Sequence, residues 1–238
     1  MSGHSKWANI KHRKAAQDAK KGKIFTRFGK EITIAAKHGG GDINSNFRLR
    51  TIVDKARAAN MPAENISRAI KRGTGELPGV NYEEQTYEGY APEGVAVLVE
   101  CLTDNKNRTV ADMRHAFSAN NGTLAEAGAV SWMFEKRGVI RVPANGKSED
   151  DFIELLIDYD IDDIDVSDNL ASITVQPKQL EVVKKVLLDA GYTVEAAEVE
   201  KVAKNTISLS PEKEEKVIAF LEHIEELDDV QNIYSNLA

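Results

Sequence analysis

The residues best placed by type and spacing to do chemistry are basic side chains at the amino terminus. Residues 1–30 contain nine Lys or Arg and one acid, Asp18, giving a net charge of +8, whereas the whole 238-residue chain carries −7. Because like charges that are packed together repel one another, this concentration indicates an anionic partner, and phosphates of a nucleic acid fit it. The candidate contacts are Lys6, Trp7, Lys11, His12, Arg13, Lys14, Lys20, Lys21 and Lys23.

Residues 6–21 can be drawn as a helix with cations on one side and alanines on the other. Trp7 then lies among the cations, where an indole could stack on a base or wedge between bases. The alternative is a solvated helix whose alanine face leans on the rest of the protein and whose Trp7 fills a core. The uneven charge along the chain favours the first interpretation, which predicts that Trp7 does not belong to a core.

Three further helices are expected before residue 80. Residues 24–37 have apolar residues at helical spacing, Asn46 can cap a second helix, and Pro62 suits the first turn of a third that ends at Gly73. The last two resemble a helix-turn-helix, which would expose Arg68 and Lys71 or Arg72, beside Asn65, for contact with bases. The turn lacks the usual glycine, and any helical hairpin exposes basic residues, so a plain surface role stays open.

The remainder of the chain is acidic and reads as alternating strands and helices. Residues 1–80 have a net charge of +11 and residues 81–238 one of −18, with a Gly/Pro-rich linker at 73–79. Residues 137–204 have the order β-α-β-β-α-β, which is ferredoxin-like. The alternation also predicts strands over 130–134, with Trp132 in the core, and over 205–209.

We therefore expect an α+β protein with an all-helical basic N-terminal domain and two ferredoxin-like α+β domains, one inserted in the other. The β-α-β pattern at the end of the chain cannot bury its own apolar face, and the unit before residue 137 lacks a similar half. The expected domains are residues 1–80, residues 81–136 plus 205–238, and the inserted residues 137–204.

A polar segment between a strand and a helix, residues 104–109, is a second candidate site. Exposed amides of a helix N-terminus, with Lys106 and Arg108 beside them, could hold a phosphate. The alternative is that this segment only caps the helix. Both interpretations stay open.

Signals of catalysis or of a metal site are not found. The five histidines lack metal-ligand spacing, Cys101 has no base near it in sequence, and the acidic run at 148–168 lacks the Gly and Glu of a calcium loop. We expect neither an enzyme nor a cofactor or metal. With one cysteine, no apolar run of membrane-spanning length and no secretory signal, we expect a cytoplasmic protein without a membrane partner.

Several segments together carry a resemblance to a known family. They are residues 2–14, Gly22–Phe25, Ala59–Pro62, Tyr87–Tyr90, Cys101–Thr109 and Met133–Glu135. In them the chain resembles the YebC/PmpR family, which includes a translational activator of mitochondrial cytochrome oxidase. The resemblance covers essentially the whole chain and implies a cytoplasmic, three-domain protein that binds nucleic acid, described in some members as a transcriptional regulator and in others as a ribosome-associated translation factor.

The sequence is compatible with three functions. The first is a nucleic-acid-binding regulator of gene expression that acts on DNA. The second is a translation factor that binds rRNA or the ribosome, and the Trp and Lys residues of the amino terminus suit structured RNA slightly better. The third is an interaction scaffold, and in each case the acidic domains could engage a protein partner.

Overall fold

From Lys21 to Gly73 the described chain forms a unit of three helices. The computed structural model describes Trp7, Ile10 and residues 21–238, with the side chain of Lys21 excepted. Asn46 caps the second of its helices, since its Oδ1 accepts a hydrogen bond from the Leu49 amide at 3.0 Å. A Cβ at Gly73 would lie 2.4 Å from the Thr33 carbonyl oxygen, so only glycine allows this close approach of two helices. The helices are α2 (Lys21–Gly39), α3 (Phe47–Ala58) and α4 (Ala63–Gly73).

Four antiparallel strands, which we call sheet A, form the second unit in the order β3-β1-β2-β8. Both of its helices cover one face, where the rings of Phe117 and Phe220 meet edge to face with centroids 5.1 Å apart. The strands are β1 (Glu83–Tyr90), β2 (Ala96–Thr103), β3 (Thr123–Ala125) and β8 (Val230–Ser235), and the helices are α5 (Lys106–Ala119) and α8 (Pro211–Glu225).

A second antiparallel sheet, sheet B, has the order β5-β6-β4-β7. Its chain order, β-α-β-β-α-β, is that of a ferredoxin-like unit. A separate core of aliphatic residues with Phe152 lies between this sheet and its helices. The elements are β4 (Phe134–Pro143), α6 (Glu149–Leu155), β5 (Ile161–Ser167), β6 (Leu170–Val175), α7 (Leu180–Asp189) and β7 (Ala196–Ala203).

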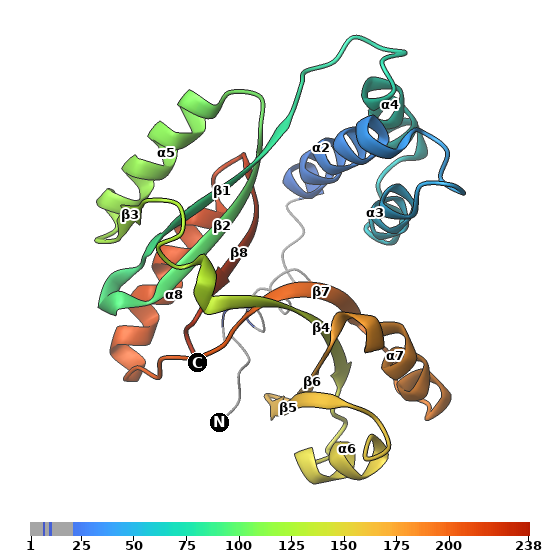
Figure 1. The fold of residues 1–238 in the computed structure, drawn as a ribbon, viewed down its shortest axis with the longest axis vertical. Helices are drawn as coiled ribbons and strands as arrows, with labels where there is room; N and C mark the ends of the chain where they lie inside the picture. Colours follow the sequence, from blue (N-terminus) through green and yellow to red (C-terminus); the bar gives the residue numbers. More distant parts are fainter. Residues whose placement is uncertain (1–6, 8–9, 11–20) are drawn as a thin grey trace.

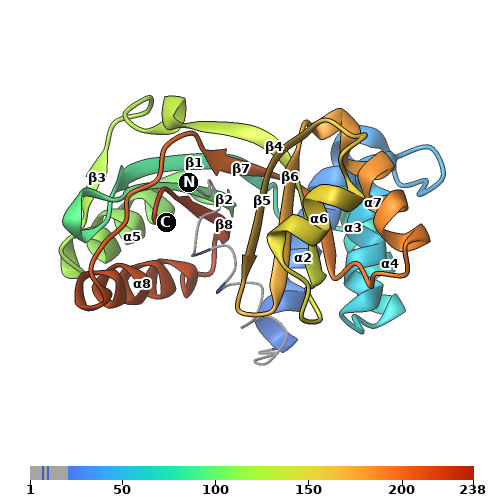
Figure 2. The ribbon, with the colours of Figure 1, turned by 90° about the horizontal axis from the view of Figure 1, so that it is seen from below.

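Figure 1 shows the three units, with β4 and β7 leading from sheet A into sheet B, and Figure 2 shows the same arrangement from below. The last strand, β8, pairs with β2 although all of sheet B lies between them in sequence. A small apolar cluster that includes Leu98, Phe134 and Ala203 joins the other face of sheet A to the beginning of β4 and the end of β7. The pairing of β8 with β2 is what we expect if residues 137–204 are inserted into a domain made of residues 81–136 plus 205–238. We propose that domain division.

The α+β class with N-terminal helices is confirmed, but some expected details differ. In sheet A the two central strands, β1 and β2, are consecutive in sequence and form a hairpin. In sheet B the central strands, β6 and β4, are not consecutive, so the two sheets do not share one strand order. Residues 205–209 form only an isolated bridge, between Ile207 and Leu237, because the segment lies beside the end of the chain and not along a strand. Trp132 lies in the 3₁₀ turn Ser131–Met133, before β4 begins, and is 65% exposed. In the part of the chain that the structure describes, no helix is both long and apolar enough to span a bilayer.

Candidate nucleic-acid interface

Most of the basic amino-terminal residues lie outside the described part of the chain. These are Lys6, Lys11, His12, Arg13, Lys14 and Lys20, and the side chain of Lys21 is not described. Their contact with nucleic acid therefore stays a prediction.

Trp7 is described, and the structure contradicts its expected stacking role. Its side chain is 1% exposed and belongs to the core between sheet A, α5 and α8. An indole in that core cannot stack on a base. The residues near Trp7 in sequence include several basic side chains, whereas the apolar face of sheet A, which is distant in sequence, buries the whole ring.

Lys23 contacts the protein itself. Its Nζ donates a hydrogen bond to the carbonyl oxygen of Glu225 at 3.0 Å, and Arg27 donates to the same oxygen at 3.2 Å. Glu225 is the last residue of α8, where helix carbonyls lack partners and cations are favourable. Burial is the main reason why the pKa of Lys23 is lowered. We infer that Lys23 joins α2 to α8 in this structure and is not free to bind a phosphate.

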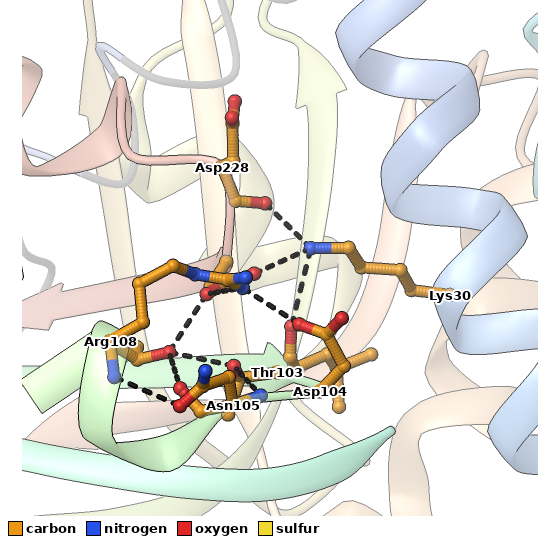
Figure 3. Close-up of polar contacts among 9 residues, drawn as sticks. Lys30, Thr103, Asp104, Asn105, Arg108 and Asp228 are labelled. Atoms are coloured by element: carbon orange, nitrogen blue, oxygen red, sulfur yellow. Dashed lines mark hydrogen bonds and ion pairs between the residues drawn. The ribbon is translucent and has the colours of Figure 1, made fainter. Parts of the chain in front are cut away.

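A buried carboxylate, Asp229, holds α2, α5 and β8 together. Figure 3 shows two of its partners, Lys30 of α2 and Arg108 of α5. Its Oδ1 accepts a hydrogen bond from Lys30 Nζ at 2.8 Å, and its Oδ2 accepts from Arg108 at 2.9 Å and from Thr109 at 2.8 Å. Lys30 also donates to the carbonyl oxygens of Leu102 and Asp228. All three protons of this buried ammonium group therefore have acceptors.

The two cations expected to hold a phosphate near residue 106 are already paired. Arg108 binds Asp104 at 2.8 Å as well as Asp229, and Lys106 lies 2.6 Å from Glu83. Asn105 caps α5, because its Oδ1 accepts a hydrogen bond from the Arg108 amide. The structure therefore favours the capping interpretation of residues 104–109.

Residues of α4 do meet in a hollow. Asn65, Arg68 and Arg72, at helical spacings of three and four residues, line a groove of about 270 Å³ opposite Lys30 of α2 and beside Tyr82. Among the described residues, the ion pair found for Arg68 is with Glu64, at 2.6 Å between two exposed side chains, an arrangement that stabilises little. No ion pair of Arg72 is found among the described residues. Lys71 points elsewhere and lines a different hollow with Arg57.

This groove, which we call the α4 groove, combines groups that bind nucleic acids. Guanidinium groups bind phosphate in a bidentate manner, an Asn amide can read a base edge, and an aromatic ring such as Tyr82 can stack. The sequence singled out Asn65, Arg68 and Arg72 but missed Tyr82, and it missed that Lys30 lines the groove while its Nζ is held by Asp229. Tyr82 lies three residues after the linker and could have been noticed, whereas the position of Lys30 depends on Asp229, which is far away in sequence.

Groups of three or more metal-binding side chains are not found among the residues that the structure describes. Burial, the largest cause, and the nearby Asp229 raise the pKa of the Cys101 thiol to about 12, so it is a poor nucleophile at neutral pH.

Comparisons with known proteins agree along the whole chain. Residues 5–76 match the model of the TACO1/YebC protein N-terminal domain, and residues 82–237 match that of the TACO1/YebC second and third domain. Relatives named "Probable transcriptional regulatory protein" include one from Thermotoga petrophila, 54% identical over 99% of this chain and 93% of its own, and one from Chlorobaculum tepidum, 51% identical over 100% and 95%.

A solved structure is also similar. The crystal structure of a conserved hypothetical protein from Aquifex aeolicus has a TM-score of 0.80 and 42% sequence identity, covering 93% of this chain and 91% of its own. Both family models, the relatives and this fold lead to one conclusion: the chain belongs to the TACO1/YebC family.

Proposed function

We propose that the protein is a nucleic-acid-binding regulator of gene expression whose N-terminal helices contact the phosphate backbone. The α4 groove carries the proposal. It brings Asn65, Arg68 and Arg72 together in one hollow, which is also lined by residues of α2 and by Tyr82 before β1. The N-terminal 80 residues have a net charge of +11 in an otherwise acidic chain. A basic unit attached to an acidic body turns towards a polyanion.

DNA is the first candidate target, because the relatives are named as transcriptional regulators. An rRNA or ribosomal target is the second, because phosphate contacts outnumber base-reading groups in the α4 groove: of its polar side chains, Asn65 alone offers an amide for a base edge. The acidic domains remain a proposed site of contact with a protein partner. We place the protein in the cytoplasm, as befits either target.

The Arg68→Ala/Arg72→Ala double variant is expected to bind nucleic acid at least tenfold more weakly than the wild-type protein. Each arginine that neutralises a phosphate adds about 1 to the slope of log affinity against log salt, so this slope should fall by about 2. Fluorescence anisotropy with a labelled DNA duplex and a labelled RNA hairpin, at several salt concentrations, measures both quantities and identifies the preferred target.

Lys178→Ala/Lys185→Ala is the matched control, since it also removes two positive charges, from exposed positions near α7. Its affinity and salt slope should stay close to the wild-type values. Equal effects of the two double variants would mean that only net charge matters and would refute a role for the α4 groove. Circular dichroism of each variant establishes that it is folded.

A further inference from the structure

Trp132 is exposed in a way that is unusual for a tryptophan. It is 65% exposed, whereas Trp7, the other tryptophan of the chain, is buried. Large aromatic side chains usually bury most of their surface, and those that remain exposed tend to lie in binding sites. Trp132 lies in the short turn that precedes β4 and is not among the residues that line the α4 groove.

The backbone around Trp132 is held in place by Glu88. This side chain lies on β1, only 6% of the residue is exposed, and its carboxylate accepts hydrogen bonds from the amides of Gly128, Val130 and Ser131 at 2.7–2.8 Å. Three amides directed at one buried carboxylate fix the loop strongly. The indole is therefore presented by an ordered backbone, which reduces the entropy lost when a ligand binds.

The polar edge of the indole already has a partner. Nε1 of Trp132 donates a hydrogen bond to the carbonyl oxygen of Ala129 at 3.1 Å. The hydroxyl group of Tyr90, which is 37% exposed, lies 3.5 Å from the same oxygen. Two exposed rings thus meet at one carbonyl group, and what they offer to a ligand is ring surface and not a hydrogen-bond donor.

A cation lies beside this pair of rings. The exposed Lys204 donates a hydrogen bond from Nζ to the carbonyl oxygen of Trp132 at 2.8 Å, and its amide donates to the carbonyl oxygen of Met133. An ion pair of Lys204 with an acid is not found within the described part of the chain. A flat aromatic face beside an unneutralised ammonium group suits a base with its phosphate, since every base has a face that can stack.

We propose that Trp132, Tyr90 and Lys204 form a stacking platform for an unpaired nucleobase. A base would lie on the indole, and Lys204 would contact the adjacent phosphate. This inference rests on the proposed function, and it adds a second contact, at the end of β1 and the start of β4, that requires a single-stranded stretch in the nucleic acid. At a protein–protein interface we would expect other apolar side chains around Trp132. Its exposed neighbours Ser131 and Lys204 are polar.

The Trp132→Ala variant tests the platform. Its affinity for a labelled single-stranded RNA of 12 uridines and for a labelled DNA duplex is compared with that of the wild-type protein. Loss of one base–aromatic stack should weaken binding of the single strand by about 5- to 150-fold and leave duplex binding nearly unchanged. Ile157→Ala, which truncates another exposed apolar side chain on the acidic part, is the matched control and should change neither affinity.

Fluorescence provides a direct measurement, because the chain has only two tryptophans. In a Trp7→Phe variant Trp132 is the sole source of indole emission, and addition of the single strand should quench it saturably. An unchanged affinity of Trp132→Ala, or emission that the single strand does not quench, would overturn the platform.

The outcomes also separate the two proposals. If Trp132→Ala binds normally while Arg68→Ala/Arg72→Ala binds weakly, the platform is wrong and the proposed function stands. If the wild-type protein binds neither the single strand nor the duplex, both proposals are wrong.

Discussion

Asp229→Ala is expected to lower the free energy of unfolding by about 3–5 kcal/mol, the usual cost of removing one partner from a buried ion pair. The carboxylate accepts hydrogen bonds from Lys30, Arg108 and Thr109, and only 6% of the residue is exposed. Without it, the ammonium group of Lys30 would remain buried with a positive charge and only two carbonyl oxygens as acceptors. Urea denaturation followed by circular dichroism measures the change.

Asp228→Ala is the control for this experiment. Asp228 is exposed, and it contacts Lys30 through its backbone carbonyl, which the substitution retains. The variant should lie within about 0.5 kcal/mol of the wild-type protein. A similar small loss for Asp229→Ala would show that the buried cluster does not hold the N-terminal helices to sheet A.

The effect of Asp229→Ala should also depend on pH. Burial alone would raise the pKa of Asp229, but hydrogen bonds from Arg108, Lys30 and Thr109 outweigh it and lower the pKa to about 2. A lowered carboxyl pKa stabilises the folded state above the ordinary value of about 3.9, and this contribution is lost as the pH falls towards 2. The difference in unfolding free energy between wild type and variant should therefore shrink between about pH 4 and pH 2. A constant difference would contradict this origin of the stability.

Trp7→Ala should be as destabilising, with a loss of about 3–5 kcal/mol, because it empties a site in the core of sheet A. Nucleic-acid affinity should change only through the unfolded fraction. Trp132→Ala removes the same side chain from an exposed position and should cost about 0.5 kcal/mol or less. Measuring stability and affinity on both variants compares the two tryptophans directly. A stable Trp7→Ala protein with weakened binding would return the stacking role to Trp7.

These two tryptophans show where sequence patterns stop being informative. Trp132 alternates with apolar neighbours and so resembles a strand residue, while Trp7 lies among basic residues and so resembles a surface residue. The structure reverses both assignments. Burial depends on which distant surface a segment packs against, and local periodicity does not contain that information.

The helices and strands themselves were largely predictable, because apolar spacing and caps such as Asn46 are local signals. The pairing of partners was not. Arg108 and Asp229 are 121 residues apart, and nothing near Arg108 in sequence shows that its charge is neutralised by a residue next to β8. Within the α4 groove the opposite holds: Asn65, Arg68 and Arg72 share one helix, so their spacing already places them on one side.

The pairing of β8 with β2 has a consequence for the order in which the protein can fold during its synthesis. Helices α2–α4 and the whole of sheet B emerge from the ribosome before β8 does, so each can collapse on a core of its own. Sheet A cannot be completed until residues 230–235 have been made, and Asp229, the acceptor for Lys30, arrives only one residue earlier. The edge of β2 is therefore unpaired while more than 120 residues are translated, and an unpaired strand edge needs protection from other strands.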